Sequence, residues 1–160
     1  MDFDLNLLGD NLLRLSIAAL AGGVIGLERE LAGQFAGLRT HMVVSLGAAV
    51  FVLLSEYIAG GDPNAAARVV QGIAAGVGFL GAGTILKLND REKIKGLTTA
   101  SSIWLAAALG SVAGFGRYEL MVAALIVAIV VLAVLKPFSN SLGPKDEEQL
   151  ASKKLREHPP

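Results

Sequence analysis

The chain contains no cysteine among its 160 residues, and only 6% of them are aromatic. Without cysteine there can be no disulfide, no thiolate metal ligand and no cysteine nucleophile. The sequence also has no Walker loop, no nucleophile elbow and no zinc-ligand spacing. The glycine-rich segment 76–83 is apolar, and no lysine follows it where a phosphate loop requires one. We therefore predict no catalytic residue, no cofactor, no specific metal site and no nucleic-acid binding.

Charge is scarce inside five long apolar runs, and 53% of all residues are hydrophobic. The runs cover residues 12–27, 42–58, 69–86, 99–115 and 120–135. A membrane-spanning helix needs roughly 17–25 residues, so several runs must recruit flanking residues. The alternative, a soluble helical bundle, is disfavoured because the runs leave no polar faces.

The runs do not alternate in polarity, which argues against membrane strands. Lipid offers no hydrogen bonds to the backbone, so each run should form a helix. The sequence predicts an all-α, polytopic membrane bundle with five transmembrane helices over residues 1–138. Residues 139–160 are predicted to form a short polar cytoplasmic tail, with room for one short helix around 146–156.

Basic residues gather on one side of the predicted membrane. That side holds Arg29, Arg39, Lys87, Arg91, Lys93, Lys95, Lys136, Lys145, Lys153, Lys154 and Arg156. The opposite side holds Arg68 and Arg117, with Arg14 just inside the first run. Basic loops stay in the cytoplasm, so we predict the N-terminus outside and the C-terminus inside. The first ten residues are acidic rather than basic, which is not typical of a secretory signal.

Small residues recur at helical spacing in four of the runs and predict close helix packing. The predicted packing glycines are Gly22, Gly26, Gly72, Gly76, Gly78, Gly81, Gly83, Gly110 and Gly114. In the third run they fall on two opposite sides, which predicts a central third helix. The fifth run has no glycine, which predicts a peripheral helix facing lipid. A small-residue face on the first or fourth helix is expected to meet a second copy in a homodimer, with Gly110→Leu disruptive and Gly110→Ser tolerated.

The motif GLxT occurs twice, at residues 37–40 and 96–99, each time after a glycine-rich run and a charged loop. The first two and the next two helices therefore form a possible parallel repeat, with a pseudo-axis along the membrane normal. A chance match of so short a motif is the alternative.

Polar residues cluster at the cytoplasmic ends of the first four predicted helices. The candidate functional or assembly residues are Glu28, Arg29, Glu30, Arg39, Thr40, His41, Thr98 and Thr99. Ionisable groups near a bilayer are usually paired or functional, and Glu28 with Arg39 is the expected pair. The alternative is an ordinary interfacial cluster that sets topology.

Three groups of polar residues at or near these helix ends allow competing roles. Thr98 and Thr99 are expected to cap the fourth helix, although the same helix end could bind an anion. His41 is expected to be structural, with a proton carrier or metal ligand as the alternative. Glu28, Glu30, Asp90 and Glu92 have the oxygen ligands that Mg²⁺ prefers. Basic residues interleave with every one of these acids, which disfavours a magnesium site.

Four motifs in order, GLERE (26–30), AGLRTH (36–41), GVGFLGAG (76–83) and KGLTTASSIW (95–104), resemble the MgtC/SapB family of bacterial membrane proteins. The resemblance covers about residues 15–116. It implies a five-helix, multi-pass protein of the bacterial inner membrane. Many such proteins carry an ACT-like domain after the fifth helix, and this chain resembles a shorter member without one. MgtC-type proteins also tend to have asparagine at the position of Thr98 and a cysteine in the fourth helix.

The resemblance implies a non-enzymatic regulatory protein linked to magnesium limitation or stress adaptation. Its implied partners are the lipid bilayer and another membrane protein such as F-type ATP synthase. The alternative is a small transporter of divalent cations or another ion. The lack of acids near the middle of the runs disfavours that alternative, because transport sites lie near the bilayer midplane.

Overall fold

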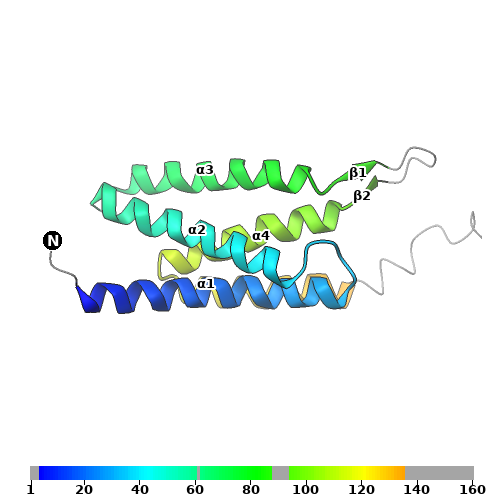
Figure 1. Cartoon of the computed structure of the whole chain (residues 1–160), viewed down its shortest axis with the longest axis horizontal. Helices are drawn as coiled ribbons and strands as arrows, with labels where there is room; N and C mark the ends of the chain where they lie inside the picture. Colours follow the sequence, from blue (N-terminus) through cyan, green and yellow to red (C-terminus); the bar gives the residue numbers. More distant parts are fainter. Residues whose placement is uncertain (1–3, 61, 88–93, 136–160) are drawn as a thin grey trace, which may run out of the picture.

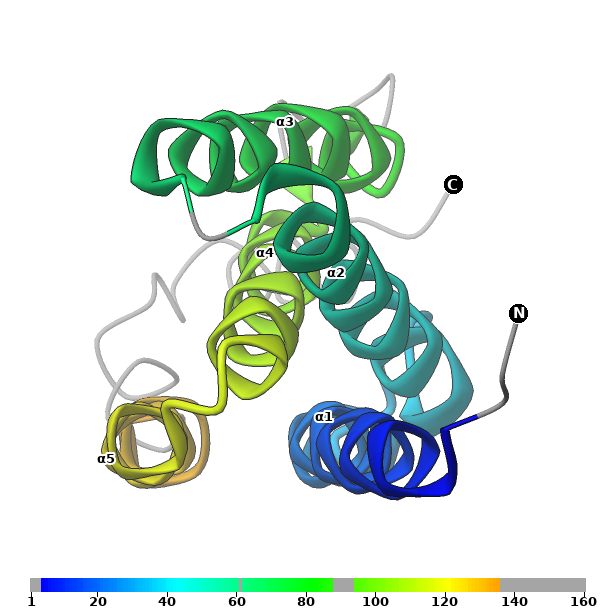
Figure 2. The same ribbon diagram turned by 90° about the vertical axis from the view of Figure 1, so that its left-hand side faces the viewer.

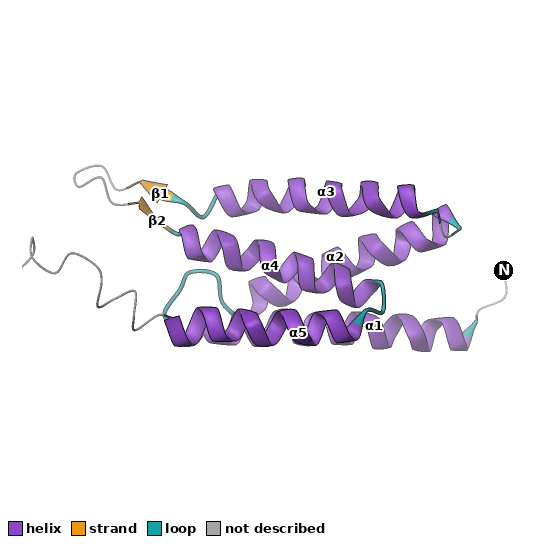
Figure 3. Ribbon diagram, turned by 180° about the vertical axis from the view of Figure 1, so that it is seen from behind, coloured by secondary structure: helices purple, strands orange, loops and turns teal. Residues whose placement is uncertain are grey.

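The computed structural model describes residues 4–60, 62–87 and 94–135, which form five helices and one minimal hairpin (Figures 1 and 3). The elements are α1 (Leu5–Leu31), α2 (Leu38–Ala59), α3 (Pro63–Ala82), β1 (Leu86–Lys87), β2 (Ile94–Lys95), α4 (Leu97–Gly114), α5 (Tyr118–Ile129) and the π-helix η1 (Val130–Val134). The two strands are antiparallel, with Leu86 opposite Lys95. The predicted helix around 146–156 lies outside the described residues.

Local capping explains why two helices begin earlier than the apolar runs predicted. The Asp4 carboxylate accepts the Asn6 N–H at 2.9 Å and starts α1. The Asp62 carboxylate accepts the Asn64 N–H at 2.9 Å, and Pro63 occupies the first helical position of α3. Aspartate caps and an N-terminal proline both favour helix initiation. These polar signals lie outside the apolar runs, so hydropathy alone places the boundaries too far into the helix.

Four of the described helices, α1 to α4, are long and apolar enough to cross a membrane. The continuous segment Tyr118–Val134, formed by α5 and η1, is apolar but shorter. The predicted all-α bundle of five helices is therefore confirmed, with the small β1–β2 hairpin as an addition. The orientation in the membrane stays a prediction.

The bundle has α2 and α4 in its middle, with α3 on one side and α1 and α5 on the other (Figure 2). Ten residues of α4 are buried, against only two of α5. The apolar core joins α1, α2, α4 and α5 through Ala18, Ala21, Ile25, Ala49, Leu109, Ala113, Met121 and Ala128. The fifth helix is peripheral, as its lack of glycine predicted.

Glycine brings α1 and α4 to close contact with α2. A Cβ added at Gly26 of α1 would lie 2.7 Å from the Cα of Leu38 in α2. A Cβ at Gly110 of α4 would overlap the carbonyl oxygen of Ser45 in α2. Gly22 and Gly114 make similarly close approaches to α2. Helices in lipid approach this closely only where side chains are small.

The expectation of a central third helix is wrong. Only Gly81 of α3 is buried, and it packs against Ala100 of α4. Nothing lies within 4 Å of a Cβ added at Gly72, Gly76 or Gly78, and Gly83 is the C-cap of α3. Small residues permit close approach but attract nothing by themselves. In this chain α2, not α3, meets the glycine faces of α1 and α4.

Candidate functional site

The candidate site is the end of the bundle where α1 finishes and where α2 and α4 begin, which we call the polar end. Loop 32–37 joins α1 to α2 there and turns at Gly33, whose φ is 72°. The Ala32 N–H donates to the Glu28 carbonyl at 2.9 Å, and the Gln34 N–H donates to the Arg29 carbonyl at 3.0 Å. The loop therefore folds back onto the end of α1.

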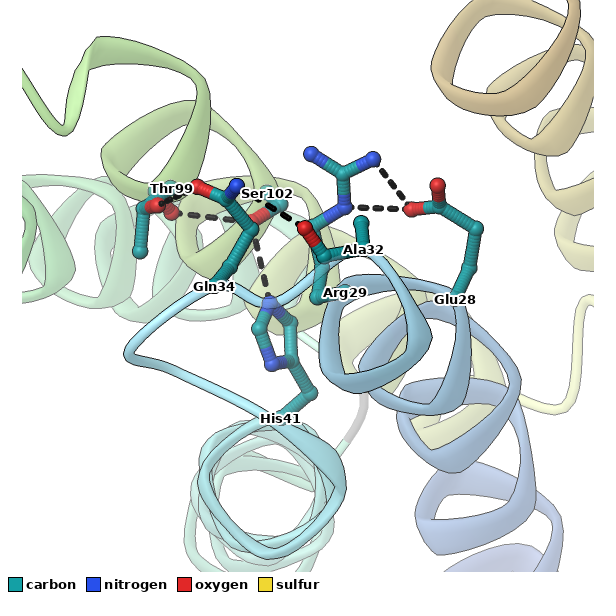
Figure 4. Close-up of polar contacts among 7 residues, drawn as sticks. All are labelled: Glu28, Arg29, Ala32, Gln34, His41, Thr99 and Ser102. Atoms are coloured by element: carbon teal, nitrogen blue, oxygen red, sulfur yellow. Dashed lines mark hydrogen bonds and ion pairs between the residues drawn. The ribbon is translucent and has the colours of Figure 1, made fainter.

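His41 is the buried link between α2 and α4 (Figure 4). Its side chain is fully inaccessible, with Nδ1 2.8 Å from the Gly37 carbonyl oxygen and Nε2 3.0 Å from the Ser102 hydroxyl. A carbonyl can only accept, so Nδ1 carries a proton. The Ser102 hydroxyl also lies 2.9 Å from the Thr99 carbonyl and has one proton to offer. In a neutral imidazole Nε2 can only accept, so Nε2 and the Thr99 carbonyl compete for this one proton.

A second link ties the loop to α4. The Thr99 hydroxyl donates to the Gln34 side-chain oxygen at 3.1 Å, and the Gln34 amide nitrogen lies 3.4 Å from the Ala32 carbonyl (Figure 4). Thr99 is 3% exposed. Thr99 and Ser102 are three residues apart on α4 and so share one face of the helix. That face holds both the loop and His41.

Charged side chains close the end of α1. The Arg29 guanidinium is 4% exposed and pairs with the neighbouring Glu28 carboxylate (Figure 4). The Glu30 carboxylate accepts the Leu38 N–H at 2.8 Å. The N-cap residue of α2 is Gly37, which has no side chain to offer, so the carboxylate from α1 satisfies a free N–H of α2. Its negative charge also suits the positive end of the helix dipole.

Two expectations about this site are wrong. Glu28 pairs with Arg29 instead of Arg39, because adjacent charges at the end of α1 meet without crossing to α2. Arg39, Thr40 and Thr98 are exposed and lie outside the buried network. Thr98 and Thr99 do not cap α4: the N-cap is Gly96, with a φ of 95° and no side-chain hydrogen bond. The two GLxT motifs do begin helices at the same relative position, α2 after Gly37 and α4 after Gly96.

The residues predicted from the sequence include neither Gln34 nor Ser102, which both belong to the network. The available signal was the three-residue spacing of Thr99 and Ser102, which placed two hydroxyls on one helix face. It gave no indication of their partners, which are far away in the sequence.

A second charged cluster at the opposite end of the bundle was also missed. Arg14 of α1 bridges Asp10 at 2.8 Å and Glu56 of α2 at 3.1 Å. It also donates to the Gly114 carbonyl at the end of α4 at 3.0 Å. One guanidinium therefore holds three helices at this end. The four-residue spacing of Asp10 and Arg14 was the signal in the sequence.

Within the described ranges, no group of three or more histidine, aspartate or glutamate side chains is placed to hold a metal ion. Asp90 and Glu92, two of the acids weighed for magnesium, lie outside those ranges. The side chains described at the polar end offer hydrogen bonding and charge pairing.

The profile of the MgtC family matches residues 15–141, which include the whole polar end and its glycine contacts. The chain belongs to the MgtC family. This agrees with the resemblance drawn from the four motifs. No solved structure shows a significant match to this MgtC-family chain.

Among its relatives, the protein named "Putative magnesium transporter YhiD" of Escherichia coli (strain K12) is 42% identical over 144 residues, covering 84% of this chain and 65% of the relative. Protein SrpB of Synechococcus elongatus is 48% identical over 117 residues, covering 67% and 64%. Protein MgtC of Brucella abortus (strain 2308) is 41% identical over 128 residues, covering 80% and 52%. The chain thus spans between about half and two thirds of the length of these relatives.

Proposed function

We propose that this MgtC-family chain is a non-enzymatic regulatory protein of the bacterial inner membrane that binds another membrane protein through the polar end. The observation that supports the proposal most is the contrast between the two sides of loop 32–37. Its inner side is held by the part-buried hydrogen bond that the Thr99 hydroxyl of α4 donates to Gln34, whereas its outer side presents Phe35, which is 96% exposed. A rigid support with an exposed aromatic side chain is a common feature of protein-binding surfaces.

The surroundings of Phe35 add to this support. Phe35 borders a hollow of about 530 Å³ that is also lined by Glu30, Arg39, Thr40 and Val43. Arg39 and Thr40 are exposed beside it. Aromatic and arginine side chains are enriched at binding hot spots, and a hollow beside them can receive a side chain of the partner. We call the exposed residues Phe35, Arg39 and Thr40 the loop surface.

The partner that we propose is F-type ATP synthase, in line with the regulatory role and the link to magnesium limitation or stress that the family resemblance implies. The test is co-purification of ATP synthase subunits with the tagged full chain from solubilised membranes. We expect Phe35→Ala and Arg39→Ala to lose the subunits, because truncation at a hot spot costs about 2 kcal/mol or more. Thr98→Ala, also exposed but on α4, is the matched control and should keep them.

Membrane insertion must be measured alongside, since an exposed aromatic side chain can also anchor in the headgroup region. The variants should remain in the membrane fraction at the level of the unchanged chain, because the apolar helices carry insertion. Retention of the subunits by both variants, or loss of both variants from the membrane, would contradict a partner site on the loop surface.

Transport of a divalent cation is the second candidate, and the name of the Escherichia coli relative favours it. The carboxylates of this chain weigh against it, since Glu28 is paired with Arg29 and Glu30 caps α2. Purified protein in liposomes, assayed for magnesium flux, separates the candidates. Saturable flux that is lost in Glu28→Ala would favour transport. Absence of flux together with subunit co-purification would favour the regulator.

A further inference from the structure

Helix α3 is attached to the bundle along one side only. Its single buried residue, Gly81, lies near the end of the helix. A Cβ added at Gly81 would lie 3.4 Å from the Ala100 carbonyl oxygen of α4. Every other residue of α3 is exposed or half-buried. Figure 2 shows the helix lying outside α2 and α4, with its far side uncovered by any described element. A helix of spanning length thus presents a whole face away from its own chain.

That face carries a polar side chain near the middle of this helix of spanning length. Gln71 is exposed and has no hydrogen bond to any residue that the structure describes. It is the ninth residue of the 20-residue helix Pro63–Ala82, so it lies roughly 12 Å along an axis of about 30 Å. The hydrocarbon core has about the same thickness, which puts the Gln71 amide far from both headgroup layers. An amide in hydrocarbon without a partner costs several kcal/mol.

Small residues surround Gln71 on the same face. Ala75 is exposed on this face, while Gly72 and Gly78 lie at its two edges, where Gly72 also lines a hollow against α2 and Gly78 a hollow against α4. A Cβ added at Gly72 or Gly78 would meet nothing within 4 Å. With Gln71 they lie within about 120° of the helix circumference. The exposed positions on this face alternate in steps of three and four: Asn64, Arg68, Gln71, Ala75, Gly78 and Ala82. This spacing is typical of the line of contact between two helices in a left-handed pair, and we call these six positions the seam.

We propose that α3 pairs with α3 of a second copy of this chain, with the two Gln71 amides hydrogen-bonded to each other at the centre. Two copies inserted in the same direction are related by an axis along the membrane normal, so identical residues meet at identical depth. A carboxamide both donates and accepts, so two of them satisfy one another. Small residues on both helices allow the close approach that this bond requires.

The neighbouring large residues are compatible with such a pair. Arg68 lies on the seam one turn nearer the start of α3, where its long side chain can extend to the headgroup region and keep its charge in contact with water. Phe79 is 83% exposed beside the seam and would cover the contact on the other side of Gln71. The small-residue faces of α1 and α4 are occupied by α2, so the dimer interface expected on those helices moves to α3.

The absence of cysteine makes disulfide cross-linking a direct test. The full chain with Ala75→Cys should form cross-linked dimers when membranes are oxidised with copper phenanthroline. Val70→Cys is the matched control on the same helix, partly exposed at 41% but about 140° away from Ala75 around the axis. Val127→Cys on α5, 61% exposed, reports random collisions in the membrane. Both controls should remain monomeric on non-reducing gels.

Replacement of Gln71 tests the hydrogen bond itself. We expect Gln71→Leu to weaken dimerisation in lipid by about three- to tenfold, the effect of one interhelical hydrogen bond. The melting temperature of the single chain should not fall, because Gln71 contacts nothing described within it. Equal cross-linking of Ala75→Cys and both controls would overturn the proposal. Cross-linking of Ala75→Cys to a different protein and not to itself would also overturn it.

Discussion

Two adjacent serines of α4 illustrate how much depends on the direction of a single side chain. Ser102 is buried and contacts Nε2 of His41, whereas Ser101 is exposed and donates to the Leu97 carbonyl one turn back. The two serines are consecutive residues of the same helix. Their contributions to stability should nevertheless differ, since only one of them satisfies a buried polar atom.

We expect Ser102→Ala to destabilise the fold by about 1–3 kcal/mol, because it leaves the buried imidazole nitrogen of His41 without its partner. Ser101→Ala should change the free energy of unfolding by less than about 0.5 kcal/mol. Unfolding in detergent titrated with SDS, followed by far-UV circular dichroism, measures both. Equal effects of the two substitutions would mean that the His41–Ser102 bond contributes little.

The surroundings of Gly110 show that the prediction of a tolerated Gly110→Ser is wrong. A Cβ at this position would overlap the Ser45 carbonyl oxygen and lie 2.8 Å from the Ser45 Cα, so serine and alanine should destabilise the fold as leucine does. The neighbouring atoms are backbone of α2 in the same chain, and they cannot rotate away. The close contact of Gly110 is thus made within one molecule.

Gly110→Ala should therefore lower the unfolding free energy by about 1–3 kcal/mol through overpacking. Gly76→Ala, whose added methyl meets nothing within 4 Å, is the matched control. It should be neutral or slightly stabilising, because alanine favours a helix over glycine. The same SDS titration measures both, and a tolerated Gly110→Ala would show that α2 and α4 can separate at no cost.

At the scale of elements, α2 depends on a residue of α1 for its start. Its own N-cap is a glycine, and the Glu30 carboxylate supplies the acceptor for the Leu38 N–H. This arrangement fixes the direction in which the chain leaves α1 and enters α2. It also holds loop 32–37, and with it the proposed loop surface.

We expect Glu30→Ala to destabilise the chain by about 1 kcal/mol, the usual value of an N-cap. Glu30→Gln keeps an acceptor but loses the charge, so it should recover part of that loss. Hydrogen exchange of the first turn of α2, read by mass spectrometry, locates the effect. Faster exchange confined to another helix would contradict the cap.

At the scale of the whole molecule, the two ends of the bundle differ in chemistry. The polar end holds the buried network around His41, and the other end holds the ion pairs of Arg14. The turn between α2 and α3 lies at the Arg14 end, where basic residues are few. The charge rule places that end outside the cytoplasm.

We therefore expect a periplasmic enzyme reporter fused at Asp62 to be active and a fluorescent protein fused after Pro160 to be bright. The physical reason is that basic loops resist translocation. An inactive Asp62 fusion together with a dark C-terminal fusion would reverse the orientation. The control for expression exchanges the two reporters, with the fluorescent protein at Asp62 and the periplasmic enzyme after Pro160.

The sequence by itself determined the helical membrane architecture, the family and the location of the polar end. Each of these depends on composition or on motifs that are local in the chain: apolar runs that lipid forces into helices, caps, and the ordered blocks around Gly26, Gly37 and Gly96. Local patterns carry this information because hydropathy and capping act within a few residues.

Only the tertiary structure decided which partners meet. Glycine spacing identified faces able to pack closely, but not that α2 fills those of α1 and α4 while α3 stays outside. The charge pattern suggested Glu28 with Arg39, whereas adjacency at the end of α1 selects Arg29. Ser102 meets His41, far away in the sequence, because three helices converge at one point. Contacts of this kind depend on the relative placement of whole helices, which no local pattern contains.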